Sequence, residues 1–348
     1  MRPYKFGITE YDPSRACPGF TIFAPSGGSE VFLINMDGEE VHKWDLPGKL
    51  GNYGQLLPNG NLLVTERTPE GPKIAPKGGR LLEMDWGGEI IWEHTDHLQH
   101  HDFNRCPNGN TLYLAWELIP PEEATCLGGI PGSEHEDGGV YYDLLREVNP
   151  DGEIVWEWRM KDRFPEQKYP IRSNRPRHEY AHANTCFLQK DGNILLSWRD
   201  LDLIALIDRK SGDLVWEMED REWGGQHDPR QLENGNITIF ANGSEQVDPE
   251  FSRVLEINPD TREVVWEYKG EPVDTFFSPR VSGAQRLSNG NTLICEGRHG
   301  RLFEVTPEGD IVWEFISPHE NIRGDGKIRQ IFRALRYDPE SPEIGGRV

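Results

Sequence analysis

Short apolar runs separated by polar turns extend along almost the whole chain, and two kinds of turn recur. The first is an Asn-Gly-Asn or Asp-Gly-Asn turn between two apolar runs, as in "LLPNGNLLV" (56–64), and it occurs five times. Asn-Gly between apolar runs is a strong hairpin signal, because both central residues of such a turn need positive φ. The second kind leads into a tryptophan-containing strand, as in "PDGEIVWEW" (150–158), and occurs six times. No segment keeps a 3.6-residue apolar period, so we expect few helices.

The tryptophans of the second turn give the length of the repeat. Successive spacings are 48, 64, 60, 50 and 47 residues for the tryptophans at positions 44, 92, 156, 216, 266 and 313. A four-stranded propeller blade takes about 40–50 residues. Each unit fits strand A, a tight turn, strand B, a longer loop, strand C, a Gly turn and strand D. The pattern therefore predicts an all-β fold, a six-bladed β-propeller.

The two ends of the chain together supply the sixth blade. Residues 19–44 match residues 290–315 from strand B onward, and the missing strand A is predicted at 328–337. A blade built from both termini closes the ring and leaves no open sheet edge. Two stacked β-sandwiches would not explain this match. We expect residues 1–348 to form a single propeller, with a lead (1–18), the blades (19–340) and a tail (341–348).

The long connections are predicted to lie on one face of the propeller. They are all B–C or D–A connections, which share a face, whereas every A–B and C–D turn is tight: 66–80, 118–139, 159–181, 243–252, 269–282 and 316–329. Loops on a rigid scaffold are where binding residues concentrate. We therefore expect a functional mouth on this face, around the axial opening.

Composition and charge limit the kinds of partner that we expect for this protein. The formal charge is −22, from 37 basic and 59 acidic residues, which disfavours nucleic acid and anionic membranes as partners. The five cysteines are odd in number and scattered, unlike a disulfide framework. No apolar stretch approaches about 18 residues, so we expect a cytoplasmic protein. Aromatic residues in 138–145 and 272–280 favour either an aromatic substrate or packing between blades.

Polar residues are predicted to ring the axial opening, because strand A is innermost and begins at that face. Counting seven residues back from each turn asparagine selects Asn52, His101, His227 and Ser282. In the third full repeat His182 lies nine residues before Asp191, so its position in the repeat matches that of the other residues only approximately. For the closing blade, Gln330 is the residue that we expect at this position.

Further polar residues are expected beside this ring. Arg199 ends strand B of the His182 blade, and strand B also finishes at this face. Asn184 lies two residues after His182 and so shares its side of the strand. Asp102 and Asp228 directly follow a histidine and are expected to point away from it, capping a turn or, at a bent strand start, orienting the imidazole.

Histidines with a guanidinium suit the transfer of an anionic tetrahedral group. A neutral imidazole can act as nucleophile or general base, while arginine and imidazolium stabilise oxyanion charge. The same His101, His182 and His227 could instead hold a divalent metal, as in a metal-dependent lyase or hydrolase. A third alternative is a non-catalytic propeller that binds a ligand or partner.

The chain resembles the arylsulfotransferase family, whose catalytic domain is a six-bladed propeller, over roughly residues 19–340. The matching motifs are "HHDFNRCPNGN" (His100–Asn110), "AHAN" (Ala181–Asn184), the arginine of "LLSWRD" and "GGQHDPR" (Gly224–Arg230). The resemblance implies that His227 accepts a sulfuryl group from an aryl sulfate and passes it to a phenol. It also implies that Arg199 and His182 bind the sulfuryl oxygens and that His101 moves protons.

These considerations give one set of expected site residues. Catalytic roles are expected for His227, His101, His182 and Arg199, and substrate binding for Asn52, His100, Asn184, Ser282 and Gln330. The expected substrate is a small aromatic or anionic molecule. No cofactor is expected, since the family needs no 3′-phosphoadenosine cofactor; a divalent metal on the three histidines is the alternative.

Overall fold

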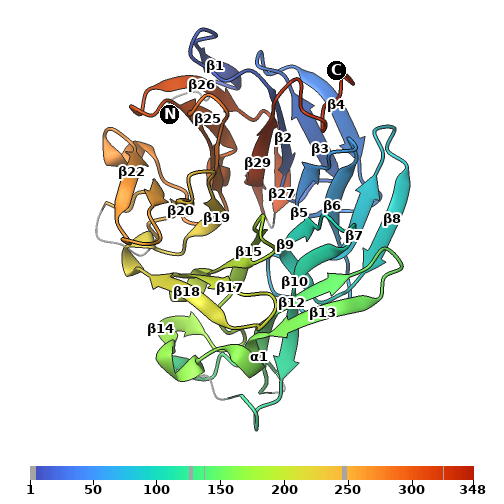
Figure 1. Ribbon diagram of the computed structural model, residues 1–348, viewed down its shortest axis with the longest axis vertical. Coiled ribbons are helices and arrows are strands. Elements are labelled where there is room, and N and C mark those ends of the chain that lie inside the picture. The colour runs from blue at the N-terminus through green and yellow to red at the C-terminus, as the bar shows by residue number, and fades with distance from the viewer. Residues whose placement is uncertain (1–4, 125–127, 137, 245–248, 324) are drawn as a thin grey trace.

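Six antiparallel sheets, five of four strands and one of five, surround a central axis in the computed structural model (Figure 1), which describes residues 5–124, 128–136, 138–244, 249–323 and 325–348. The prediction of a six-bladed propeller is confirmed. Five blades follow one another along the chain, each with its first strand innermost: β5–β8 (Leu50–Leu56, Leu62–Arg67, Gly79–Met84, Ile90–Thr95), β9, β10, β12 and β13 (Gln99–Arg105, Thr111–Ile119, Val140–Val148, Ile154–Arg159), β15–β18 (Ala183–Leu188, Ile194–Trp198, Leu203–Ile207, Leu214–Glu219), β19–β22 (His227–Gln231, Ile237–Ala241, Arg253–Ile257, Val264–Lys269) and β23–β26 (Gly283–Arg286, Thr292–Glu296, Arg301–Val305, Ile311–Ile316).

Both chain ends build the closing blade, as predicted. Its strand order is β29-β2-β3-β4, with bounds Ile331–Tyr337, Phe20–Pro25, Glu30–Ile34 and Glu40–Asp45. The C-terminal β29 pairs antiparallel with β2 (Figure 1). The predicted lead is not wholly outside the sheets, because β1 (Gly7–Tyr11) adds a fifth strand to the outer edge of β26. No repeat signature marks β1, so the periodicity could not find it.

The recurring tryptophans join each blade to the next. The indole Nε1 of Trp44 donates to the carbonyl oxygen of Asp85 (3.0 Å), and Trp92 donates in the same way to Pro150 (2.8 Å). In the blade of Trp156, this contact is made by Trp158. Trp313 donates to Met36 (2.8 Å) and so links the last blade to the closing one. The tryptophan of the repeat signature therefore links neighbouring blades by a hydrogen bond, in addition to its apolar packing.

The Asn-Gly turns differ in one detail from the expectation. At the first of them only Gly60 has positive φ (+84°), whereas Asn59 does not. The Gly60 amide donates to the Leu57 carbonyl oxygen, and the Asn59 side chain accepts from the Asn61 amide (3.0 Å). This is a type I turn followed by a left-handed glycine, which the longer hairpin loop favours over a two-residue turn.

Helices are few and short in the described part of the chain. The longest is α1 (Met160–Arg163), and none of the described helices could reach across a bilayer. Cys17, Cys106, Cys186 and Cys295 are buried and form no disulfide, while Cys126 lies outside the described residues.

The aromatic residues of the two inserts pack between elements. The Phe276 ring lies 5.5 Å from that of Phe240, and the Tyr142 ring lies 5.1 Å from that of Tyr180. These rings are buried. Packing therefore accounts for Phe276 and Tyr142, whereas Tyr141 of the first insert lines a cavity of about 700 Å³.

Candidate functional site

A cavity of about 490 Å³ lies at the axis, where the innermost strands begin. Six of the nine expected site residues line it: Asn52, His101, His182, Arg199, His227 and Gln330. The long connections supply most of the remaining wall, including Ala75–Lys77 and the hairpin β27–β28 (Asn321–Arg323, Gly326–Ile328). The long connections and the ring of polar residues therefore line the same cavity.

An unusual backbone turns the site residues toward this cavity. His101 and His182 have φ of +46° and +58°, and Asp228 has +54°. The strand pairing shifts register at the same places, between β9 and β10, β15 and β16, and β19 and β20. Such bulges redirect side chains, and positive φ at non-glycine residues costs on the order of 1–3 kcal/mol. The same local distortion therefore recurs in the three histidine-bearing blades.

The other three expected residues lie behind the cavity wall, which corrects their assignment as substrate contacts. His100 is fully buried and stacks on Trp116, with ring centroids 4.2 Å apart. Asn184 is fully buried and donates to the Gln226 carbonyl oxygen (2.7 Å). Ser282 donates to the Ser278 hydroxyl (2.8 Å) and accepts from the Gly297 amide. Each of these polar groups contacts the scaffold. For Asn184, which was expected on the cavity from strand alternation, the register shift between Ala183 and Thr185 interrupts that alternation.

His227 presents one chemically defined nitrogen to the cavity. Its Nδ1 lies 3.0 Å from the Gly225 carbonyl oxygen and 2.8 Å from Oδ1 of Asn242. The Asn242 amide nitrogen donates to the carbonyl oxygens of Ser278 and Val281, which fixes Oδ1 as the atom that faces the imidazole. Both neighbours of Nδ1 are acceptors, so Nδ1 carries the proton and Nε2 keeps its lone pair. Burial lowers the pKa of His227 to about 3, so the ring is neutral at physiological pH.

Arg199 lies beside His227 because a glycine leaves room for it. A side chain at Gly225 would meet the Arg199 side chain at 3.3–3.7 Å, and Gly225 has a φ of +82° that disfavours other residues. The guanidinium is oriented by Asp200, with Nη1 2.6 Å from Oδ1. Arg199 also lines an adjoining cavity of about 700 Å³, together with His182. These two side chains therefore stand between the two spaces.

A chain of imidazoles runs from the cavity into the interior. Nε2 of His182 lies 3.2 Å from Nε2 of His101, and Nδ1 of His101 lies 2.7 Å from Nδ1 of His100. At the near end, Nδ1 of His182 bonds the Glu179 carboxylate at 2.8 Å. The other Glu179 oxygen accepts from the Trp116 indole (2.8 Å). The arrangement is a continuous path along which a proton can move.

Charge and burial set opposite pKa directions along this chain. Burial lowers the pKa of His182, but the charge of Glu179 and its hydrogen bond outweigh burial and hold that pKa above the ordinary imidazole value. Burial, followed by the charges of His182 and His100, pushes the pKa of His101 well below the ordinary value. His182 is therefore the imidazole that holds the positive charge, next to Arg199.

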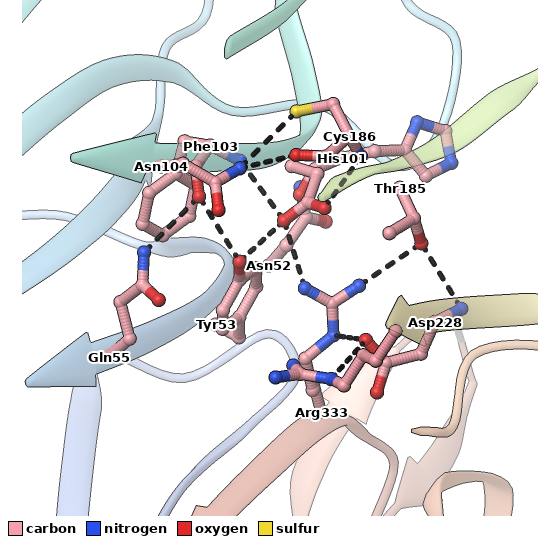
Figure 2. Close-up of polar contacts among 12 residues, drawn as sticks. Asn52, Tyr53, Gln55, His101, Phe103, Asn104, Thr185, Cys186, Asp228 and Arg333 are labelled. Atoms are coloured by element: carbon pink, nitrogen blue, oxygen red, sulfur yellow. Dashed lines mark hydrogen bonds and ion pairs between the residues drawn. The ribbon is translucent and has the colours of Figure 1, made fainter. Parts of the chain in front are cut away.

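Asp102 and Asp228 serve a different purpose from the one expected. Both are buried, and Arg333 from β29 lies between them, with Nη1 2.9 Å from Asp102 Oδ1 and Nε 2.9 Å from Asp228 Oδ1. Figure 2 shows Arg333 beside Asp228. Asp102 also accepts from the Cys186 amide of the next blade, and Asp228 from the Ala284 amide. They neither cap a local turn nor touch an imidazole. Each fixes the start of a strand in the following blade.

The metal alternative has no ligand set in the described part of the chain. It requires His101, His182 and His227 to converge on one ion, but no three His, Cys, Asp or Glu side chains among the described residues are placed to hold a metal. The ring nitrogens of His101 instead face two other imidazoles. The geometry fits an imidazole chain better than a ligand sphere.

Sequence reasoning missed Asn242, Glu179 and Arg333. Asn242 directly follows β20, the place that Arg199 occupies after β16, so inspection of every strand B end would have found it. Glu179 lies three residues before His182 in a long connection, with no repeat signal. Arg333 belongs to the apolar β29, where a buried cation has no sequence signature of its own.

Asn242 should control the tautomer of His227. We expect Asn242→Ala to lower kcat about tenfold to hundredfold with a smaller effect on KM, because Nδ1 loses one of its two acceptors. Steady-state kinetics would measure this. Asn104→Ala is the matched control, since Asn104 also joins two blades through its amide but contacts the Cys186 carbonyl oxygen. An equal loss in both variants would contradict a specific role for Asn242.

The fold and the cavity define a class: a six-bladed β-propeller whose axial cavity is lined by histidines and an arginine. The model of the family Arylsulfotransferase (ASST) matches residues 77–318, more than half of the chain. The chain therefore belongs to the arylsulfotransferase family. No functionally curated protein matches its sequence.

Solved structures resemble the chain in fold. A protein of unknown function from Bacteroides caccae aligns with a TM-score of 0.58 at 16% identity, covering 92% of this chain and all of the other. A streptogramin B lyase aligns with a TM-score of 0.51 at 11% identity, covering 95% and 93%. Virginiamycin B lyase from Staphylococcus aureus with quinupristin gives 0.50 at 14%, covering 94% and 98%. At these identities the similarity concerns the propeller alone.

Proposed function

We propose that the protein transfers a sulfuryl group from an aryl sulfate to a phenolic acceptor through a sulfohistidine at His227. The observation that carries the proposal is the fixed tautomer of His227. Its Nε2 is an uncharged nucleophile in a cavity that also contains Arg199 and His182. Membership of the arylsulfotransferase family supports the same reaction class.

The reaction then has two displacement steps at sulfur. In the first, the Nε2 lone pair of His227 forms a bond to sulfur, and the bond from sulfur to the aryl oxygen breaks. The aryl oxygen keeps that electron pair and takes up a proton. In the second step, the oxygen of the acceptor phenol attacks the same sulfur and loses its proton. The N–S bond breaks and returns the electron pair to Nε2, so the kinetics are ping-pong.

The neighbouring residues stabilise the charge and transfer the protons in these two steps. Arg199 and the protonated His182 bind the sulfuryl oxygens, where preorganised cations stabilise developing charge. The leaving aryl oxygen needs a proton and the acceptor phenol must lose one. We assign this exchange to His182 and His101, which share one proton between their Nε2 atoms, 3.2 Å apart. That proton moves to the leaving aryl oxygen in the first step and returns from the acceptor phenol in the second.

A covalent labelling experiment tests the proposal. Mixing the protein with excess p-nitrophenyl sulfate and no acceptor should release about one p-nitrophenol per active site in a rapid burst. Mass spectrometry should then find one added SO3 group on the peptide that contains His227, and a phenol should remove it. Metal analysis and chelation of the same preparation test the metal alternative. No burst and no adduct, with activity lost on chelation, would overturn the proposal.

The pH profile should show a falling limb on the alkaline side. The folded pKa of His182 is raised, so its charge is present below that pKa and is lost as pH rises through it. We therefore expect kcat/KM to fall as pH rises through the pKa of His182, which lies above the ordinary imidazole value. The pKa of His227 is about 3, so His227 causes no acidic limb above that pH. Glu179→Gln keeps the bond from Trp116 but removes the charge, and should move the falling limb to lower pH. An unmoved limb would show that another group titrates.

A further inference from the structure

The wall of the axial cavity away from the imidazoles is cationic. Besides Arg199, the described residues that line it include Lys49, Arg67, Lys77 and Arg280, but no aspartate or glutamate. The chain as a whole carries a formal charge of −22. A cavity with this lining concentrates anions against the average field of the protein. One sulfuryl group at Arg199 and His182 does not account for the remaining cations.

Lys77 is the most constrained of these cations. Its side chain is almost fully buried (4% exposed), and its Nζ has no hydrogen-bond partner among the described residues. A buried ammonium without a partner costs several kcal/mol, unless an anion binds there. Burial lowers the pKa of Lys77, and the charge of Arg67 lowers it further, against a smaller opposite effect of Glu70. Of these two charged neighbours, the one that lines the cavity is the cation, Arg67.

The backbone holds Lys77 in place. Lys77 forms an isolated antiparallel bridge with His100, and the Gly78 amide donates to the Gln99 carbonyl oxygen (3.1 Å). A side chain at Gly78 would overlap the Gln99 amide oxygen at 1.9 Å, so this approach to β9 requires glycine. Lys77 is thus anchored to the strand that bears His101. A rigid support of this kind is typical of binding residues.

Lys77 and Arg199 act on different parts of the cavity. Arg67 ends β6 and Lys77 lies in the connection between β6 and β7, whereas Arg199 directly follows β16, two blades further along the chain. The sulfuryl position and the Lys77 position are therefore on different blades around one cavity of about 490 Å³, which is large enough for a substituted aromatic ring.

We propose that Lys77 and Arg67 form a second anion-binding subsite, which takes a carboxylate or sulfonate on the non-reacting end of the aryl substrate. The proposal rests on the proposed function for the identity of the reacting end. The preferred substrate class is then an aryl sulfate that carries a second anionic group. The ring lies between the two subsites, and the sulfate ester faces His227.

Binding of non-transferable sulfonates tests the subsite independently of catalysis. A carbon–sulfur bond cannot be cleaved by the displacement above, so benzenesulfonate and 4-sulfobenzoate report binding alone. Calorimetry should show that the wild-type protein binds 4-sulfobenzoate about tenfold to hundredfold more tightly than benzenesulfonate, since each charged hydrogen bond contributes at that scale. Lys77→Met should remove this preference while leaving the affinity for benzenesulfonate unchanged.

Matched variants distinguish a specific anion-binding subsite from a general effect of positive charge on the protein. Lys190→Met removes one positive charge from an exposed position paired with Glu233, and should keep the full preference. Arg67→Gln changes an exposed side chain and should reduce the preference, which decides the question if Lys77→Met does not fold. Equal affinity for both sulfonates, or equal weakening of both in Lys77→Met and Arg67→Gln, would overturn the subsite. Failure of the His227 labelling experiment would leave these affinities intact, so the two proposals fail separately.

Discussion

His227→Asn is expected to lower kcat/KM for an aryl sulfate by a factor of about 10⁴ or more, which is the scale for loss of a catalytic nucleophile. The asparagine amide nitrogen can occupy the place of Nδ1 and still donate to Gly225 and to Asn242. Only the nucleophilic nitrogen is then lost. The variant should fold normally and should show neither the p-nitrophenol burst nor the SO3 adduct. Rapid mixing and mass spectrometry would measure both.

A control variant makes this result specific. His94→Asn also replaces a partly buried imidazole, which in β8 bonds the Tyr113 hydroxyl at 3.1 Å and does not line the cavity. Its turnover should stay close to that of the wild-type protein. A persistent burst in His227→Asn would place the nucleophile elsewhere, and equal losses in the two variants would point to a change in folding.

The propeller could be predicted from the sequence because each blade repeats the same local signals. The Asn-Gly turns and the tryptophans recur in register, and the tryptophans also join neighbouring blades, as Trp313 does with Met36. The closing blade was predictable for the same reason: its two halves carry the same pattern as an uninterrupted blade. The repeated local signals were therefore enough to predict which distant parts of the chain form one blade.

The site was only partly predictable because its chemistry depends on irregular backbone and on distant partners. Counting back from the turns found His101 and His227, but simple alternation failed at the bulges and placed Asn184 on the cavity. The tautomer of His227 depends on Asn242, from the neighbouring strand. Lys77 lies in a connection with no repeat, so only its contact with His100 brings it to the axis.

Arg333→Met should destabilise the protein by about 3–5 kcal/mol, the cost of removing one partner from a buried charge cluster. The guanidinium lies between Asp102 and Asp228, which are both about 2% exposed. Methionine fills a similar volume but leaves the Asp102 charge without a cation. Urea denaturation, with the free energy of unfolding extrapolated to water, would measure the loss.

Arg230→Met is the matched control for Arg333→Met, because Arg230 contacts the same Asp228 oxygen (Nε 3.0 Å) from a position that is 20% exposed. Water can replace part of that interaction, so we expect a loss of about 1 kcal/mol or less. Adding Asp102→Asn to Arg333→Met should recover part of the lost stability, since it removes the unpaired charge. If the two arginine variants were equally stable, the cluster of Arg333, Asp102 and Asp228 would not hold the ring together.

This cluster joins the C-terminal strand to the residues that directly follow His101 and His227. Loss of Arg333 should therefore reduce the turnover of the molecules that remain folded, which a loss of blade packing alone would not do.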